Sequence, residues 1–253
     1  MYDDKSLDRI LFFDIETVPG VASLADFSPE MQHLWNEKFE SLQRRMPERF
    51  TADETADYAL RNGGGIFSEF AKIVCISVGY IYSDKNGNRL MRTRSFADDD
   101  EAKILRDFAA MLADFQKKRK IKKGGLLLCG HNIKEFDVPF ICRRMLVHGM
   151  PLPPVLDVAG LKPWETPYLD TLELWKFGDY KSFTSLKLLC ALFGIATPKD
   201  DIDGSQVATV YYEQHDLPRI AIYCEKDVVA TAQVFLRLNA MPLLDPANVT
   251  HVE

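Results

Sequence analysis

The sequence has no long apolar run. Its longest uninterrupted apolar stretches, such as residues 126–129, fall far short of the ~20 residues that a helix needs to cross a bilayer. The N-terminal stretch MYDDKSLDRI is also charged where a secretory signal peptide would be apolar. These absences predict a cytoplasmic protein that makes no contact with a membrane.

Paired cysteines and a basic charge balance are missing as well. The five cysteines are odd in number and include no C-x-x-C spacing, so we expect reduced core residues. The formal net charge of −6 argues mildly against a general nucleic-acid-binding protein. It does not exclude a nuclease, because carboxylates that gather at one site contribute negative charge that bound cations cancel.

The overall composition is that of an ordinary globular domain. With 253 residues, 47% of them hydrophobic and 27% charged, the chain is long enough to form one sizeable core. We therefore expect residues 1–253 to form a single domain of α/β type.

The stretch LFFDIET, residues 11–17, organises this domain. Read with the two-residue period of a strand, it places Asp14 and Glu16 on one face with Phe12 and puts apolar residues on the other face. Two ionised carboxylates about 4 Å apart repel by ~4 kcal/mol at an effective dielectric of ~20, and a divalent cation between them removes that repulsion. Asp-x-Glu triplets are common, however. For this triplet alone, a strand that ends at Phe13 before a solvated acidic loop is the simpler interpretation.

Residues 18–71 separate this stretch from the next clear strand. The Ser-Pro pair at residues 28–29 is typical of a helix start, and Thr51 with Glu54 matches a capping box that opens a second short helix. The glycine-rich residues 62–65 are suited to end that helix. We interpret this segment as a helical insertion beside the acidic end of the first strand, and as a candidate mobile lid.

The middle of the chain predicts further strands. Residues 72–82 are rich in β-branched side chains, and an Asn86-Gly87 turn joins them to residues 89–96. These two strands should therefore pair antiparallel. An amphipathic helix then leads to a buried strand at residues 126–129.

Asp137 follows that strand where a helix begins. Pro139 fixes the helix start near Asp137, and an aspartate at such a place usually caps the helix. Taken singly, Asp137 is therefore interpreted as a cap. Asp170 and Glu173 are likewise interpreted as helix-start residues rather than as part of a site.

The last helix carries a fourth acid. On a helical wheel, Asp227 falls among the apolar residues Ile220, Cys224 and Thr231. A carboxylate on the buried face of a helix must be paired or must bind a metal. Tyr223 lies one turn before Asp227 on the same side of the helix. For Tyr223 alone, a core aromatic side chain is an equally good interpretation.

Four acids therefore share one explanation: Asp14, Glu16, Asp137 and Asp227. Oxygen ligands without a cluster of histidines or cysteines favour Mg²⁺ or Mn²⁺ over Zn²⁺. Two such ions about 4 Å apart can hold both the attacking and the leaving oxygen of a phosphodiester, as in nucleases. We predict a site for two Mg²⁺ or Mn²⁺ ions, with Tyr223 orienting the attacking water.

The motifs that carry these residues resemble those of the DEDD exonuclease superfamily. The three similar motifs, in chain order, are Asp14-Ile-Glu16-Thr, Asn132-x-x-x-Phe136-Asp137 and Tyr223-x-x-x-Asp227. The third has the tyrosine form, because Ile222 stands where the histidine form would place its histidine. The most similar group is the predicted 3′–5′ exonucleases that resemble the proofreading domain of family-B DNA polymerases, and the resemblance spans residues 9–238.

The resemblance implies a fold and a division of labour. The fold would be ribonuclease H-like, a mixed sheet with helices on both faces, here with the helical insertion after the first strand. Asp14, Glu16 and Asp227 would hold the ion that activates water. Asp14 would also hold the second ion, with Asp137 supporting it through a water molecule.

The predicted function is a metal-dependent 3′–5′ exonuclease that hydrolyses phosphodiester bonds from the 3′ end of single-stranded or frayed DNA. The resemblance implies that Thr17 and Asn132 contact the terminal nucleotide or shape its pocket. An RNA-trimming exoribonuclease of the same fold stays open, because no feature of the sequence reads a 2′-hydroxyl group. A nucleic-acid-binding module with an inactive site is a further alternative. No motif identifies a protein partner.

Overall fold

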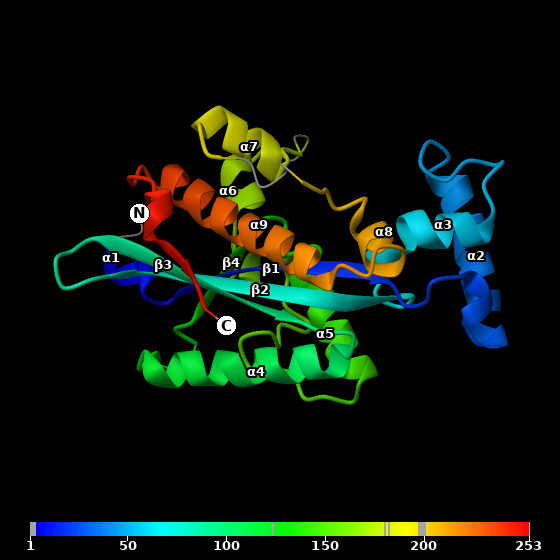
Figure 1. Cartoon of the computed structure of the whole chain (residues 1–253), viewed down its shortest axis with the longest axis horizontal. Coiled ribbons are helices and arrows are strands. Elements are labelled where there is room, and N and C mark those ends of the chain that lie inside the picture. The colour runs from blue at the N-terminus through cyan, green and yellow to red at the C-terminus, as the bar shows by residue number, and fades with distance from the viewer. Residues whose placement is uncertain (1–3, 123, 180, 182, 197–200, 253) are drawn as a thin grey trace.

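The computed structural model describes residues 4–122, 124–179, 181, 183–196 and 201–252, which form a mixed sheet of six strands in the order β5-β4-β1-β2-β3-β6 (Figure 1). The strands are β1 (Ile10–Pro19), β2 (Ala71–Ser83), β3 (Arg89–Ala97), β4 (Leu127–Gly130), β5 (Leu169–Asp170) and β6 (Val249–His251). The first three strands pair antiparallel, and β4 and β5 run parallel to β1.

Strand β1 lies inside the sheet and is buried on both faces. Leu11, Phe13 and Ile15 pack into the core cluster on one side, whereas Phe12 packs into the cluster on the other. The predicted alternation is therefore confirmed. The strand is longer than the sequence indicated, because it continues past the acidic residues to Pro19. The alternative that it ends at Phe13 is wrong.

Helices cover both faces of the sheet (Figure 1). One face carries α4 (Glu101–Lys118) and α5 (Asp137–Val147). The other carries the long α9 (Leu217–Leu238) with α6 (Thr171–Lys176), α7 (Leu186–Phe193) and α8 (Val207–Tyr212) packed beside it. The short helices are α1 (Asp4–Leu7), η1 (Leu24–Asp26), η2 (Gly64–Ile66), η3 (Pro163–Glu165) and η4 (Pro246–Asn248). The predicted α/β architecture, a mixed sheet with helices on both faces, is confirmed.

Helix α9 lies close to the sheet because β2 has a glycine beneath it. A Cβ atom at Gly79 would come within 3.0 Å of Val228 Cγ1 and within 2.5 Å of Met91 Cε. A larger residue there would displace the flexible end of Met91 and crowd Val228 of α9.

The insertion forms a small hydrophobic cluster of its own at the end of β1. Its helices are α2 (Pro29–Arg45) and α3 (Ala56–Gly63), which pack around Trp35. The start of α2 is as predicted, since the Ser28 hydroxyl accepts a hydrogen bond from the Met31 amide. The predicted capping box at Thr51 is wrong. Helix α3 begins four residues later, where Thr55 Oγ1 accepts from the Tyr58 amide.

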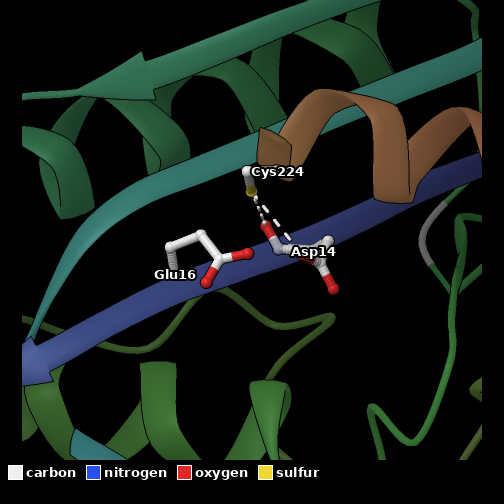
Figure 2. A group of neighbouring side chains, drawn as sticks. All are labelled: Asp14, Glu16 and Cys224. Atoms are coloured by element: carbon white, nitrogen blue, oxygen red, sulfur yellow. Dashed lines mark hydrogen bonds between the residues drawn. The ribbon is translucent and has the colours of Figure 1, made fainter. Parts of the chain in front are cut away.

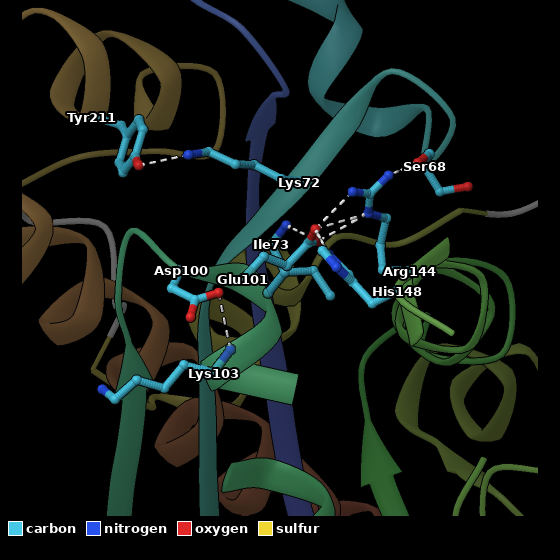
Figure 3. A network of polar contacts seen from close by, with 9 residues as sticks. All are labelled: Ser68, Lys72, Ile73, Asp100, Glu101, Lys103, Arg144, His148 and Tyr211. Carbon is cyan, nitrogen blue, oxygen red and sulfur yellow. Dashed lines mark hydrogen bonds and ion pairs between the residues drawn. The ribbon is translucent and has the colours of Figure 1, made fainter. Parts of the chain in front are cut away.

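A buried ion pair fixes α5 against the start of α4 (Figure 3). The Glu101 carboxylate accepts hydrogen bonds from Arg144 Nη2 at 2.7 Å, from His148 Nε2 at 2.8 Å and from the Ile73 amide at 2.8 Å. Arg144 Nη1 also donates to the Ser68 carbonyl at 2.9 Å. Burial alone would raise the pKa of Glu101, but these hydrogen bonds outweigh it and lower the pKa. The network therefore joins α4, α5, β2 and the end of the insertion.

Among the described residues, none of the helices has both the length and the apolar character needed to span a membrane.

Candidate active site

Strand β1 presents Asp14 and Glu16 toward α9 (Figure 2). They pair across the sheet with Ser77 and Cys75 of β2, and the register shifts directly after Glu16. Glu16 is 8% exposed and Asp14 is half-buried. One carboxylate oxygen of each lies within 4.8 Å of the other and of Cys224 Sγ. Two carboxylates thus share one small, largely water-excluded space.

Asp137 reaches the same place from the opposite side of β1. It is the first residue of α5, is 3% exposed, and its Oδ1 accepts a hydrogen bond from the Ile15 amide at 3.2 Å. The interpretation of Asp137 as a helix cap is wrong, because Phe136 occupies the N-cap position and no side chain caps the helix there. The Asp137 carboxyl therefore accepts from β1 as well as from its own main-chain amide.

Residues 130–136, here called the Asn132 loop, carry the chain from β4 to α5. A Cβ atom at Gly130 would lie 1.9 Å from Ile133 Cγ2, so only glycine fits there, and Asn132 adopts a left-handed φ of 67°. The buried Asp170 accepts hydrogen bonds from the amides of Asn132 at 2.9 Å and Lys134 at 3.1 Å. Asp170 also caps α6, as predicted from the sequence, but its second role in shaping this loop was missed.

Helix α9 supplies the remaining residues. Tyr223 is buried and its phenol hydrogen-bonds with the Asp227 side chain. Asp227 is half-buried, so it lies nearer the edge of the apolar face than the helical wheel indicated. The Cys224 thiol donates to Asp14, with Sγ 3.4 Å from the main-chain oxygen and 3.6 Å from Oδ2. The sequence placed Cys224 in the core and missed this contact, although it directly follows Tyr223.

The electrostatics show that the four acids converge. Burial raises the pKa of Asp14 well above its usual value, and the charges of Asp137, Asp227 and Glu16 each raise it further. Burial likewise raises the pKa of Asp137 to about 8, and the nearby Asp170 and Asp227 contribute. Carboxylates from β1, α5 and α9 thus raise one another's pKa, and Asp14 and Glu16 also bring carboxylate oxygens within 4.8 Å of each other. We call Asp14, Glu16, Asp137 and Asp227 the acid site.

The two other titratable groups at the acid site stay protonated. Burial raises the pKa of the Tyr223 phenol, as do the charges of Glu16 and Asp227. Burial also raises the pKa of the Cys224 thiol well above its usual value. Cys224 therefore acts as a hydrogen-bond donor to Asp14 rather than as a thiolate ligand. The donor set that remains is made of carboxylate oxygens, which suits Mg²⁺ or Mn²⁺.

The two residues predicted to contact the nucleotide lie beside the acid site but make other contacts. Thr17 Oγ1 donates to the Gly65 carbonyl of the insertion at 2.7 Å. Asn132 is half-buried, and its main-chain amide donates a hydrogen bond to Asp170. The adjacent His131 was not singled out from the sequence. Its Nε2 donates to the Thr184 carbonyl at 3.1 Å, which anchors the Asn132 loop. The contacts of Thr17 and Asn132 with a nucleotide stay a prediction.

Comparisons with known proteins give one match to a family and a set of matches to solved structures. A family model described as a predicted 3′–5′ exonuclease related to the exonuclease domain of PolB matches residues 66–243. This range contains Asp137, Tyr223 and Asp227, and it begins after Asp14 and Glu16. No curated protein sequence matches the chain.

Among the solved structures is the family B DNA polymerase from the hyperthermophilic archaeon Pyrobaculum calidifontis. It matches with 16% sequence identity and a TM-score of 0.49, over 90% of this chain and 24% of the polymerase. The chain thus spans about a quarter of the length of that polymerase.

Proposed function

Because the chain belongs to the family of predicted 3′–5′ exonucleases related to the exonuclease domain of PolB, we propose that it removes nucleotides one at a time from the 3′ end of single-stranded or frayed DNA. Residues 1–253 would act as one exonuclease domain, with 18–71 as its insertion. The observation that carries the proposal is the convergence of carboxylates on Asp14 from β1, α5 and α9.

The acid site fits divalent cations by its donor chemistry. Asp14, Glu16 and Asp227 would hold one Mg²⁺ or Mn²⁺ ion, and Asp14 with Asp137 would hold a second. Bound ions of this kind lower the pKa of water and stabilise the attacking and leaving oxygens of a phosphodiester. Burial and the neighbouring carboxylates raise the pKa values of Asp14 and Asp137, because both disfavour the ionised acids. A bound cation would stabilise the ionised form.

The residues of the chain would then position the reactants. The protonated Tyr223 phenol, held by Asp227, would hydrogen-bond the attacking water and orient it. The Cys224 thiol and the Ile15 amide hold Asp14 and Asp137 in place. Thr17 and Asn132 would contact the terminal nucleotide.

A 5′-labelled single-stranded oligonucleotide with a free or a blocked 3′ end tests the proposal. With Mg²⁺ present, the free end should give a stepwise ladder and the blocked end none. Asp14→Ala and Asp227→Ala should abolish cleavage with the circular dichroism spectrum unchanged. Asp107→Ala, which removes an exposed carboxylate from α4, should cleave normally. No shortening by the wild-type protein, or equal cutting of a blocked end, would refute the proposal.

The same preparation separates the alternatives. DNA and RNA oligomers of one sequence show which polymer is shortened faster. An inactive binding module would show no metal response, whereas Mn²⁺ at about 100 times its dissociation constant should add ~2.7 kcal/mol to the free energy of unfolding.

A further inference from the structure

Two phenylalanines in one short stretch of the chain are exposed to solvent. Phe177 is 84% exposed and Phe183 is 67% exposed, on the segment that joins α6 to α7. Both helices lie on the α9 side of the sheet (Figure 1). Large aromatic side chains contribute most when they are buried, so two in one short exposed segment call for a binding role.

The backbone at Phe177 supports a role other than stability. Phe177 ends α6 with φ 45° and ψ 34°, in the left-handed region. Helices commonly end with glycine at such a position, and Gly178 follows directly. A side chain larger than glycine costs roughly 1 kcal/mol in this conformation. The cost is not offset by burial, because the ring lies almost entirely in solvent. Strain of this kind is typical of functional positions.

The two ends of the segment lie near the Asn132 loop, and one of them is hydrogen-bonded to it. At one end, Lys176 pairs with Glu173 at 2.6 Å and lies close enough to Glu135 and Asp170 for their charges to raise its pKa. At the other end, the Thr184 carbonyl accepts from His131 Nε2 at 3.1 Å. Phe177 and Phe183 are each one residue from these anchors. The backbone positions that carry the two rings therefore lie near the loop that leads to Asp137.

The segment is also locally basic in an acidic protein. Residues 176–187 contain three lysines and one aspartate, whereas the whole chain has a net charge of −6. Lys181 and Lys187 are exposed. Positive charge interleaved with exposed aromatic rings is complementary to a single-stranded nucleic acid, whose phosphates and unpaired bases need those two kinds of contact.

We propose that Phe177 and Phe183 form a stacking surface for unpaired bases of the strand whose 3′ end enters the acid site. This inference rests on the proposed function and names how the substrate is selected. Stacking tolerates any base, because every base has a π-face, but it requires bases that are not already paired and stacked in a duplex. The surface would therefore favour single-stranded or frayed ends. Lys181 and Lys187 would contact the intervening phosphates.

Binding without cleavage tests the surface separately from the chemistry. The probe is a 5′-fluorescein oligothymidylate of about ten nucleotides, titrated in a chelator and followed by anisotropy. Phe177→Ala and Phe183→Ala should each weaken binding about tenfold, whereas Phe177→Trp, which keeps an aromatic ring, should restore it. Leu146→Ala removes another exposed apolar side chain (61%), from the far end of α5, and should change nothing. Binding to a blunt duplex should be the same for all variants.

A double-mutant cycle between protein and DNA identifies the contact as stacking. An abasic residue is placed at each position of the probe in turn. At a stacked position it should weaken wild-type binding about tenfold and weaken the matching alanine variant hardly at all. Additive effects at every position would overturn the stacking surface.

The outcomes distinguish this inference from the proposed function. If the alanine variants bind as tightly as the wild type while the wild type shortens DNA, the stacking surface is wrong and the exonuclease stands. If the wild type neither binds nor shortens the oligonucleotide, both are wrong.

Discussion

Replacing Asp137 with asparagine should make the metal-free protein more stable at neutral pH. Asp137 is almost fully buried, and its pKa is raised from 3.8 to about 8, chiefly by burial and then by Asp170 and Asp227. Asparagine has nearly the same shape and carries no titrating proton. Its Oδ1 can still accept the hydrogen bond from the Ile15 amide. The substitution therefore removes the cost of the acid without breaking its structural contact.

The size of the effect follows from the pKa shift. Between about pH 4 and pH 8 the folded protein keeps a proton on Asp137 that the unfolded chain has released. The free energy of unfolding consequently falls by ~1.4 kcal/mol for each unit of rising pH, and it levels off above about pH 8. At pH 7 the accumulated cost is roughly 4 kcal/mol. Asp137→Asn should lose this slope and gain about that amount over the wild type.

Urea unfolding in a chelator, at half-unit steps from about pH 5 to pH 8, measures both quantities. For a chain of this length, ~4 kcal/mol corresponds to a melting temperature about 10 °C higher. Excess Mg²⁺ should narrow the difference, because the wild type would bind both ions whereas the variant lacks the Asp137 ligand of the second. Asp107→Asn, at an exposed position of α4, is the charge-matched control and should leave the slope unchanged. A variant no more stable than the wild type at pH 7 would show that Asp137 is not desolvated as described.

Two further changes separate chemistry from architecture. Tyr223→Phe should lower the single-turnover cleavage rate about 100-fold. The Mn²⁺-induced rise in melting temperature should persist, because the four acids remain. Loss of that rise would contradict a role of Tyr223 confined to orienting water. Glu101→Gln should destabilise the fold by ~3 kcal/mol, since it leaves the buried Arg144 guanidinium without its charge partner. The pKa of Glu101 is lowered, so its stabilisation is present above the unfolded value of 4.5 and is lost as the pH falls through the folded value. The glutamine variant should therefore show a shallower loss of stability on the acid side, and an unchanged acid limb in denaturation would contradict this.

Features that depend on neighbouring residues were predictable from the sequence. The two-residue period placed Asp14 and Glu16 on one face of β1, and the Asn86-Gly87 pair located the turn between β2 and β3. Gly87 has a φ of 82° there, which glycine adopts without strain. Strand periodicity and tight turns depend on a few consecutive residues, so the sequence alone predicts them.

The start of α3 shows where local patterns compete. Thr51 with Glu54 satisfies the capping-box pattern, yet the helix begins after Thr55. The Trp35 indole donates to the Ala56 carbonyl at 2.8 Å, which fixes that residue against α2. Packing across the insertion therefore decides between two adjacent caps that the sequence presents as equivalent.

The acid site depends on contacts that no local pattern encodes. Its two defining links join the Ile15 amide to Asp137 and Cys224 to Asp14, across 122 and 210 residues of chain. The first exists because β4 lies parallel to β1, with Cys129 opposite Phe12, so the Asn132 loop begins beside the acidic end of β1. The second depends on the packing of α9 against β1, β2 and β3. Strand order and helix packing therefore bring these dispersed carboxylates together, which is why Asp14, Glu16 and Asp137 taken singly supported simpler interpretations.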